Sequence, residues 1–372
     1  MTGMIRRRSG GIDGDAPSTF KGYVIDQRIH TTSSDMINVN SGVESRINDI
    51  HNASHCYVCE LVNGVLQAKQ LSDSDKTLWV DGTTATVEAN QDVMMKLPRF
   101  WWKAIPDEND DDICEINFTM DNPEDNTWFE WEGNTFIGVY KGYVSDSKLY
   151  SHSGNVGAYT RTTLNNYRNY ARNRGTGYTL LTYEVIQILA LLGFGRLKRL
   201  NPYNVYGTTG VNSDPQTRGQ CDNLGMTDGR NGSYTSFWGL ESYITGSGLS
   251  EIVDNISRGT DLFNILDTSN LSSVKRVVSC PSYYSGNSWC KKIKLGAYGD
   301  VFPKEVTTSK PSNTAAGYGG YVNITNNGFV HNNYANTNNT SFVSLSATSG
   351  TGTALIYASS RLCYKGNYQI IT

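Results

Sequence analysis

The chain has 372 residues, of which 38% are hydrophobic and 18% charged, with a net charge of -3 and a mean hydropathy of -0.43. This length suggests about two domains, and the weakly negative charge excludes a bulk attraction to nucleic acid. The 37 Gly and 23 Tyr, with only 9 Pro, indicate many turns and few long helices.

No segment predicts insertion into a membrane. The most apolar run, residues 185–192, is far shorter than the roughly 20 residues that a bilayer-spanning helix needs. Arg6, Arg7 and Arg8 are not followed by an apolar stretch, so we do not expect a secretion signal. Without such a signal, we expect the protein to be made in a cytoplasm. The seven cysteines are odd in number and widely scattered, which predicts free thiols and not a disulfide framework.

The first 91 residues predict a basic flexible tail (1–18) and a small mixed α/β module (19–91). Residues 19–28 are typical of a short strand. Ser41 and Glu44 have the spacing of a capping box, and an apolar stripe follows, so we expect a helix over residues 41–61 that ends at Asn63-Gly64. This stripe is too apolar for exposure, which favours a role of the module in oligomerisation or attachment.

Residues 92–372 predict a second domain of short strands and long loops. Strands are expected over 128–131 and 136–144, from their aromatic and β-branched residues. Thr182 favours a helix over 183–192 that ends at Gly193 and Gly195 and is apolar nearly all round, so it belongs in a core. A brief helix is expected near 249–256. The predicted fold class is α+β.

Several short stretches of this second part resemble one protein family. They are residues 92–98 (DVMMKLP), 151–154 (SHSG), 175–192 (GTGYTLLTYEVIQILALL), 227–229 (TDG), 238–241 (WGLE), 251–256 (EIVDNI) and 360–366 (SRLCYKG). Their order is similar to that in the C-type-lectin-like domains shared by formylglycine-generating enzymes, phage fibres and phage variable tropism proteins. Residues 248–255 depart from the pattern, because the tryptophans usual there are missing.

The resemblance implies a structural protein of a bacteriophage virion, a head or tail fibre. Such a protein binds a glycan or protein of the host surface through its C-terminal domain, is commonly a homotrimer, and attaches to other virion proteins through its N-terminal module. The metal-binding enzymes of this family use a cysteine pair or a histidine cluster. Here only His152 and His331 follow residue 100, and Cys280, Cys290 and Cys363 lack compact ligand spacing. We therefore expect no catalysis and no cofactor.

Two alternatives stay open at this point. One is an enzyme, either a fibre-borne polysaccharide-degrading enzyme, which needs a pair of carboxylates across a groove, or a formylglycine-type oxidase. The other is a purely structural capsid-decorating protein that binds no receptor.

Residues 318–341 form the strongest candidate for a binding surface. Eight of the 17 residues from 323 to 339 are Asn, interleaved with aromatic residues, and recognition loops favour this composition. The alternative is a solvent-facing strand-and-turn region whose asparagines form turns. The predicted ligand-binding residues are Tyr321, Asn323, Asn326, Asn327, Phe329, His331, Asn332, Asn333, Tyr334 and Asn336.

Three further clusters favour a structural interpretation. His51, His55 and Cys59 would lie on one stripe of the predicted helix, where zinc binding is less favoured than packing or subunit contact. Residues 107–112 (DENDDD) lack the pattern of a calcium loop and predict a solvated loop. A third set favours surface ion pairs or subunit contacts over nucleic-acid binding: Arg161, Arg168, Arg172 and Arg174. We expect no bound metal.

Overall fold

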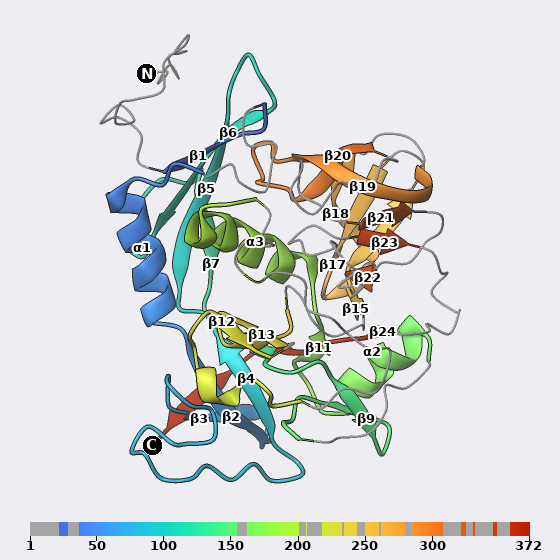
Figure 1. Cartoon of the computed structure of the whole chain (residues 1–372). Coiled ribbons are helices and arrows are strands. Elements are labelled where there is room, and N and C mark those ends of the chain that lie inside the picture. Colours follow the sequence, from blue (N-terminus) through green and yellow to red (C-terminus); the bar gives the residue numbers. More distant parts are fainter. Residues whose placement is uncertain are drawn as a thin grey trace.

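The chain folds into several small β-sheets around a central helix (Figure 1). The computed structural model describes residues 22–28, 37–154, 162–200, 206, 218–232, 234–243, 250–259, 262–279, 284–307, 321–324, 330–331, 345–347 and 358–372. Within them, strands hold 44% of the residues and helices 16%, with three α-helices. The predicted α+β class is therefore wrong, and the fold is β-rich, because segments expected as helix form strands.

A seven-stranded sheet, which we call the basal sheet, joins strands from both ends of the chain. Its order is β11-β25-β8-β4-β2-β3-β26, with β26 parallel to β3. The predicted boundary between residues 91 and 92 thus crosses a continuous sheet, because β2 pairs with β4 and β3 with β26. The strands are β2 (His55–Val62), β3 (Val65–Gln70), β4 (Asp92–Lys96), β8 (Thr135–Gly138), β11 (Tyr178–Leu180), β25 (Leu362–Lys365) and β26 (Tyr368–Ile371).

Residues 41–61, predicted as one helix, form a helix followed by a strand. α1 (Ser41–Asn52) is capped by the side chain of Asn40, which accepts a hydrogen bond from the backbone N–H of Val43. The chain then forms β2, and Asn63 and Gly64, both with positive φ, make the tight turn into β3. An Asn-Gly pair between two strands is a strong hairpin signal, so these residues turn a hairpin and do not end a helix.

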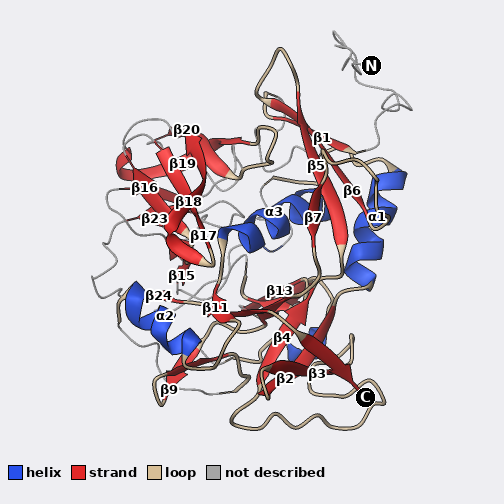
Figure 2. Cartoon of the chain, turned by 180° about the vertical axis from the view of Figure 1, so that it is seen from behind, coloured by secondary structure: helices blue, strands red, loops and turns tan. Residues whose placement is uncertain are grey.

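A four-stranded sheet packs beside α1 and the central helix α3 (Tyr183–Leu197). Its order is β1-β6-β5-β7, and the predicted strand near the N-terminus is confirmed as β1. The strands are β1 (Tyr23–Asp26), β5 (Phe100–Pro106), β6 (Ile113–Thr119) and β7 (Phe129–Trp131). Figure 2 shows α3 between this sheet and the strands β17 to β20.

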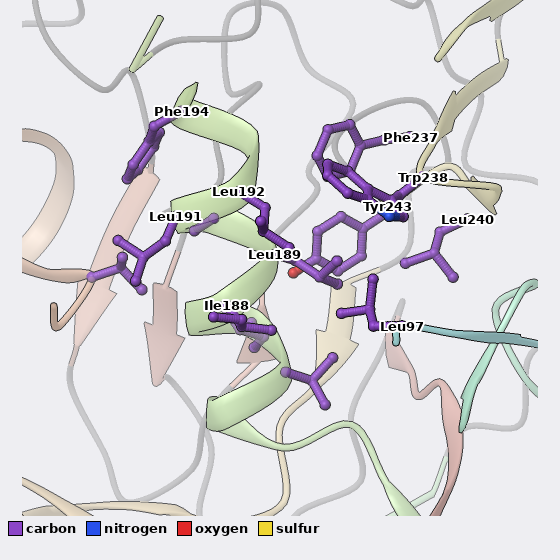
Figure 3. Close-up of a cluster of buried hydrophobic side chains, with 14 of the residues drawn as sticks. Leu97, Ile188, Leu189, Leu191, Leu192, Phe194, Phe237, Trp238, Leu240 and Tyr243 are labelled. Carbon is purple, nitrogen blue, oxygen red and sulfur yellow. The ribbon is translucent and has the colours of Figure 1, made fainter. Parts of the chain in front are cut away.

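The predicted core helix is confirmed, but it continues past both glycines that were expected to end it. In α3, every residue from Val185 to Gly195 is buried. Figure 3 shows Leu189 and Leu192 facing Phe237 and Tyr243, with Phe194 on the opposite side of the helix. A Cβ at position 195 would lie 2.4 Å from Ile47, so this glycine lets α1 and α3 approach closely.

A second seven-stranded sheet, the C-terminal sheet, holds much of the last third of the chain. Its order is β20-β19-β21-β23-β22-β15-β24. Residues 249–256, expected as a helix, contribute strands β15 and β16. The strands of the sheet are β15 (Ser250–Ile252), β19 (Tyr284–Lys294), β20 (Phe302–Thr307), β21 (Tyr321–Ile324), β22 (Val330–His331), β23 (Leu345–Ala347) and β24 (Ala358–Ser359).

Smaller elements complete the described fold. Arg168 and Arg172 of the predicted basic run lie on α2 (Leu164–Arg172), which begins at the N-cap Thr163, and Arg174 follows it. One three-stranded sheet comprises β12 (Gly229–Asn231), β13 (Tyr234–Phe237) and β14 (Leu240–Glu241), and another comprises β16 (Ile256–Gly259), β17 (Leu262–Asp267) and β18 (Asn270–Ser279). β9 (Tyr143–Ser145) pairs with β10 (Lys148–Tyr150), and Asp222–Leu224 form a short 3-10 helix.

Candidate functional site

Three of the ten predicted ligand-binding residues fall in strands of the C-terminal sheet. Tyr321 and Asn323 lie in β21, and His331 ends β22; only their backbone is described. The other seven lie outside the described residues: Asn326, Asn327, Phe329, Asn332, Asn333, Tyr334 and Asn336. The predicted surface therefore stays a prediction, but the strand pairing shows where these segments join the sheet.

One end of the C-terminal sheet gathers the ends of several strands. β21 and β23 are parallel, and β22 runs antiparallel to β23, so that the start of β23 at Leu345 pairs with His331, the last residue of β22. On the other side, Trp289 of β19 pairs with both Tyr321 and Thr307. Segments 308–320 and 332–344 thus leave and re-enter the sheet at this end, which we call the Tyr321 end.

The two parts of the predicted stretch join opposite ends of β22. Segment 325–329, with Asn326, Asn327 and Phe329, connects Ile324 to Val330, whereas residues 332–336 follow His331 at the Tyr321 end. Because β22 is two residues long, these two attachment points are separated by only about 7 Å of strand.

A buried ion pair anchors β15, the strand next to β22. Glu251, whose Cα pairs with that of His331, contacts Arg361 at 2.7 Å, and both side chains are fully buried. Arg361 also donates hydrogen bonds to the carbonyl oxygens of Gly138, Val139 and Glu241. Since Arg361 lies between β24 and β25, its contacts tie the C-terminal sheet to the basal sheet at one point.

A second polar cluster lies next to this ion pair. Arg218 donates to the carbonyls of Lys141 and Gly142, while Glu241 accepts from the backbone N–H groups of Gly219 (3.1 Å) and Cys221 (2.8 Å). Burial lowers the pKa of Lys141 to about 7 and raises that of Glu241 to about 7. Both groups can therefore exchange protons near neutral pH, but both are at most 5% exposed, so we assign them to the stability of the fold.

A metal site would need several His, Cys, Asp or Glu side chains whose ligand atoms lie close together. Within the described residues, one group of three such ligand atoms converges, that of Asp110, Asp111 and Asp112. Cations already neutralise it: Arg28 pairs with Asp110, Lys304 with Asp111, and Lys292 and Lys304 with Asp112. The loop predicted to be solvated is thus tied to β19 and β20 through Asp112, whose side chain is 12% exposed.

The predicted stripe of His51, His55 and Cys59 does not exist, because α1 ends before His55. His51 contacts the ring of Trp238 and the carbonyl of Met226, and burial and the nearby Arg196 lower its pKa. His55 pairs with Asp73 at 2.9 Å. Cys59 is fully buried in β2. The packing interpretation therefore describes His51 and Cys59.

The described cysteines are poor candidates for nucleophiles. Six of them are free and buried, while Cys280 lies outside the described residues. Burial raises the pKa of Cys56, Cys114 and Cys221 to about 12, so these thiols stay protonated at neutral pH.

Two arginines of the predicted basic run form ion pairs inside the protein. Arg168 pairs with Asp254 and Arg174 with Asp92, whose side chain is fully buried. Arg172 is exposed, and Arg161 lies outside the described residues. Two of the four therefore form ion pairs, but inside the protein and not at the surface as predicted.

A scan against models of known protein families and a search of curated proteins both found no match to this chain. None of the described helices combines the length and the apolar composition needed to cross a membrane. Sequence reasoning missed the roles of Glu251, Lys141 and Arg361. The available signal was that Glu251 and Arg361 both lie in stretches that carry the family resemblance.

Proposed function

We propose that the protein is a fibre protein of a bacteriophage virion that binds the host cell surface with the Tyr321 end of its C-terminal sheet. The observation that carries this proposal is the convergence of several strand ends there, with the connecting segments 308–320 and 332–344 rich in Asn, Ser, Thr and Tyr. Connections of this composition on a rigid framework are typical of recognition surfaces.

The framework beneath this end supports a binding role. A recognition surface works best when the elements that carry it are held in one geometry, since less entropy is then lost on binding. Arg361 holds β15 and β24 in place. Its fully buried side chain contacts Glu251 and three backbone carbonyls. The sheet is therefore tied to the basal sheet at Glu251, which pairs with His331, the last residue of β22.

The resemblance to phage fibres supplies the rest of the proposal. A homotrimer attached through its N-terminal residues to other virion proteins would present three Tyr321 ends to the cell. In this proposal the protein acts by binding, without a cofactor.

Labelled protein added to a panel of bacterial strains, each with and without its capsule, tests the proposal. We expect saturable binding to some strains, with Tyr334→Ala weakening it about tenfold or more and leaving the melting temperature nearly unchanged. Tyr298→Ala is the matched control, since Tyr298 is 50% exposed and lies in the β19–β20 turn. We expect this control to bind normally.

Three results would contradict the proposal. Absence of binding to every strain would favour a decorating protein. Release of reducing sugar ends from capsule by the purified protein would favour the polysaccharide-degrading enzyme. Loss of stability without specific loss of binding in the Tyr334 variant would place this ring in a core and move the surface elsewhere.

A further inference from the structure

β26 lies at an edge of the basal sheet, and Figure 1 shows the C-terminal end of the chain beside β3. It pairs with β3 on one side and stands last in the order of the described strands of this sheet. The backbone N–H of Leu66 donates to the carbonyl of Asn367 at 3.0 Å. The N–H and C=O groups of one strand residue point to the same side, and successive residues alternate, so those of Tyr368 and Ile370 point away from β3. These groups are available to a further strand.

The side chains of this edge are apolar and uncharged. Tyr368 is 37% exposed and Ile370 is 44% exposed. They are two residues apart in one strand, so they share a face of the sheet. β26 (sequence YQII) has no charge and no proline, two features by which edge strands commonly prevent pairing with other chains. An edge of this kind is a template for the addition of a strand.

A lysine lies against these side chains. The Nζ atom of Lys96 is 5.2 Å from the centroid of the Tyr368 ring, which is a cation–π contact. Burial lowers the pKa of Lys96, and no carboxylate of the described residues forms an ion pair with it. His55, whose Cα pairs with that of Lys96, pairs with the nearby Asp73. A carboxylate supplied by another molecule would therefore stabilise the charged form of Lys96.

We propose that β26 is a docking site for an extended acidic segment of another protein, which adds to the basal sheet as a further strand. The main chain of this segment would form hydrogen bonds with Tyr368 and Ile370, as in other cases of strand addition. On the Tyr368 face, an apolar side chain would pack against Ile370, and an acidic side chain two residues away would pair with Lys96.

The charge at this edge favours such a segment over a second copy of β26. The strand YQII would bring no carboxylate to Lys96, and β3 and β26 together contain one charged residue, Lys69. The docking site is separate from the proposed host-binding surface, which belongs to the C-terminal sheet.

A library of random peptides displayed on yeast, probed with the labelled full-length protein, tests the proposal. We expect the selected peptides to carry Asp or Glu two residues from an apolar residue. Binding of a synthetic copy of one such peptide should weaken about tenfold in Lys96→Met. Replacing the acid of the peptide by its amide should weaken binding to the unchanged protein similarly and have little further effect on Lys96→Met. Lys275→Met is the matched control and should bind normally, since Lys275 is 62% exposed on β18 of another sheet.

The main-chain contacts are tested separately. Ile370→Pro removes an N–H that points away from β3 and keeps an apolar side chain, and we expect it to weaken peptide binding about tenfold or more. A melting temperature close to that of the unchanged protein shows that this variant is folded. Peptides N-methylated at alternate residues test the same contacts without any change in the protein. We expect one of the two alternating sets to abolish binding and the other to leave it unchanged.

Other results overturn this docking site. One is that no peptide is selected from the library. Another is that the selected peptides lack acids, or bind Lys96→Met and Ile370→Pro as tightly as the unchanged protein. Light scattering that gives the unchanged protein twice the mass of Ile370→Pro would mean that a second copy of the chain occupies the edge.

Discussion

Replacing Arg361 by Met tests whether one buried ion pair holds the two seven-stranded sheets together. The substitution keeps an unbranched, similarly long side chain but removes every hydrogen-bond donor. Glu251 would then be a buried carboxylate without its cation, and the carbonyls of Gly138, Val139 and Glu241 would lose their donor.

The expected loss is large because both side chains are fully buried. Removing one partner of a buried ion pair typically costs about 3–5 kcal/mol in the free energy of unfolding. A protein of ordinary stability has about 5–15 kcal/mol in total, so Arg361→Met should remove at least about a fifth of the stability. The double variant Arg361→Met, Glu251→Met leaves no unpaired charge, and we expect it to recover about half of this loss.

Urea unfolding followed by tryptophan fluorescence measures these free energies. Arg99→Met is the matched control, since Arg99 pairs with Glu130 at 2.6 Å but is 59% exposed. An exposed pair of this kind contributes at most about 1 kcal/mol. A loss for Arg361→Met as small as that of the control, or a double variant less stable than the single one, would refute the assigned role of the ion pair.

Four further predictions concern the core, the pH dependence and the first 91 residues. Leu189→Asp should unfold the protein, because an unpaired charge at this fully buried position of α3 costs several kcal/mol; an unchanged melting temperature would count against the core assignment. Burial alone would raise the pKa of Asp112, but hydrogen bonds from Lys292 and Lys304 outweigh it and hold the pKa below its usual range. Stability from this carboxylate is therefore present above its unfolded-state pKa and lost as the pH falls through the folded value, and Asp112→Asn should flatten this acid limb of a stability–pH curve. Lys141, with its pKa lowered to about 7, binds fewer protons folded than unfolded between pH 7 and 10.5, so stability should rise with pH in this window, and Lys141→Met should remove the rise. Deletion of residues 1–91 should prevent folding of the rest, because it removes β2 and β3 from the middle of the basal sheet; a cooperative melt of the truncated chain would show otherwise.

Some features followed from local sequence alone. The run of residues 183–192 is apolar on all sides, and a helix with no polar face has to be buried whatever it packs against, so its core position was predictable. The aromatic and β-branched residues around 23–26 and 129–131 predicted strands for a similar reason, since their shape fits a pleated surface.

Tertiary contacts decided the features that local patterns left ambiguous. Residues 55–62 are as compatible with a helix stripe as with a strand, and pairing with β4 on one side and β3 on the other makes them a strand. The start of α3 is capped by Asn255, 72 residues away, while Thr182 makes no side-chain cap bond. Gly195, a helix terminator in local terms, is instead the contact point with Ile47.

The candidate site also has some features that the sequence predicts and others that depend on tertiary contacts. Its composition follows from the sequence alone, because residues 311–360 are rich in Asn and aromatic residues and carry no Asp, Glu, Lys or Arg. The points at which its segments join the sheet, and the Glu251–Arg361 pair that ties this sheet to the basal sheet, depend on strands far apart in sequence. A local pattern records only the preference of a segment for helix, strand or turn. The partner of each strand is selected by the burial and hydrogen bonding of the whole chain, and only the folded structure contains that choice.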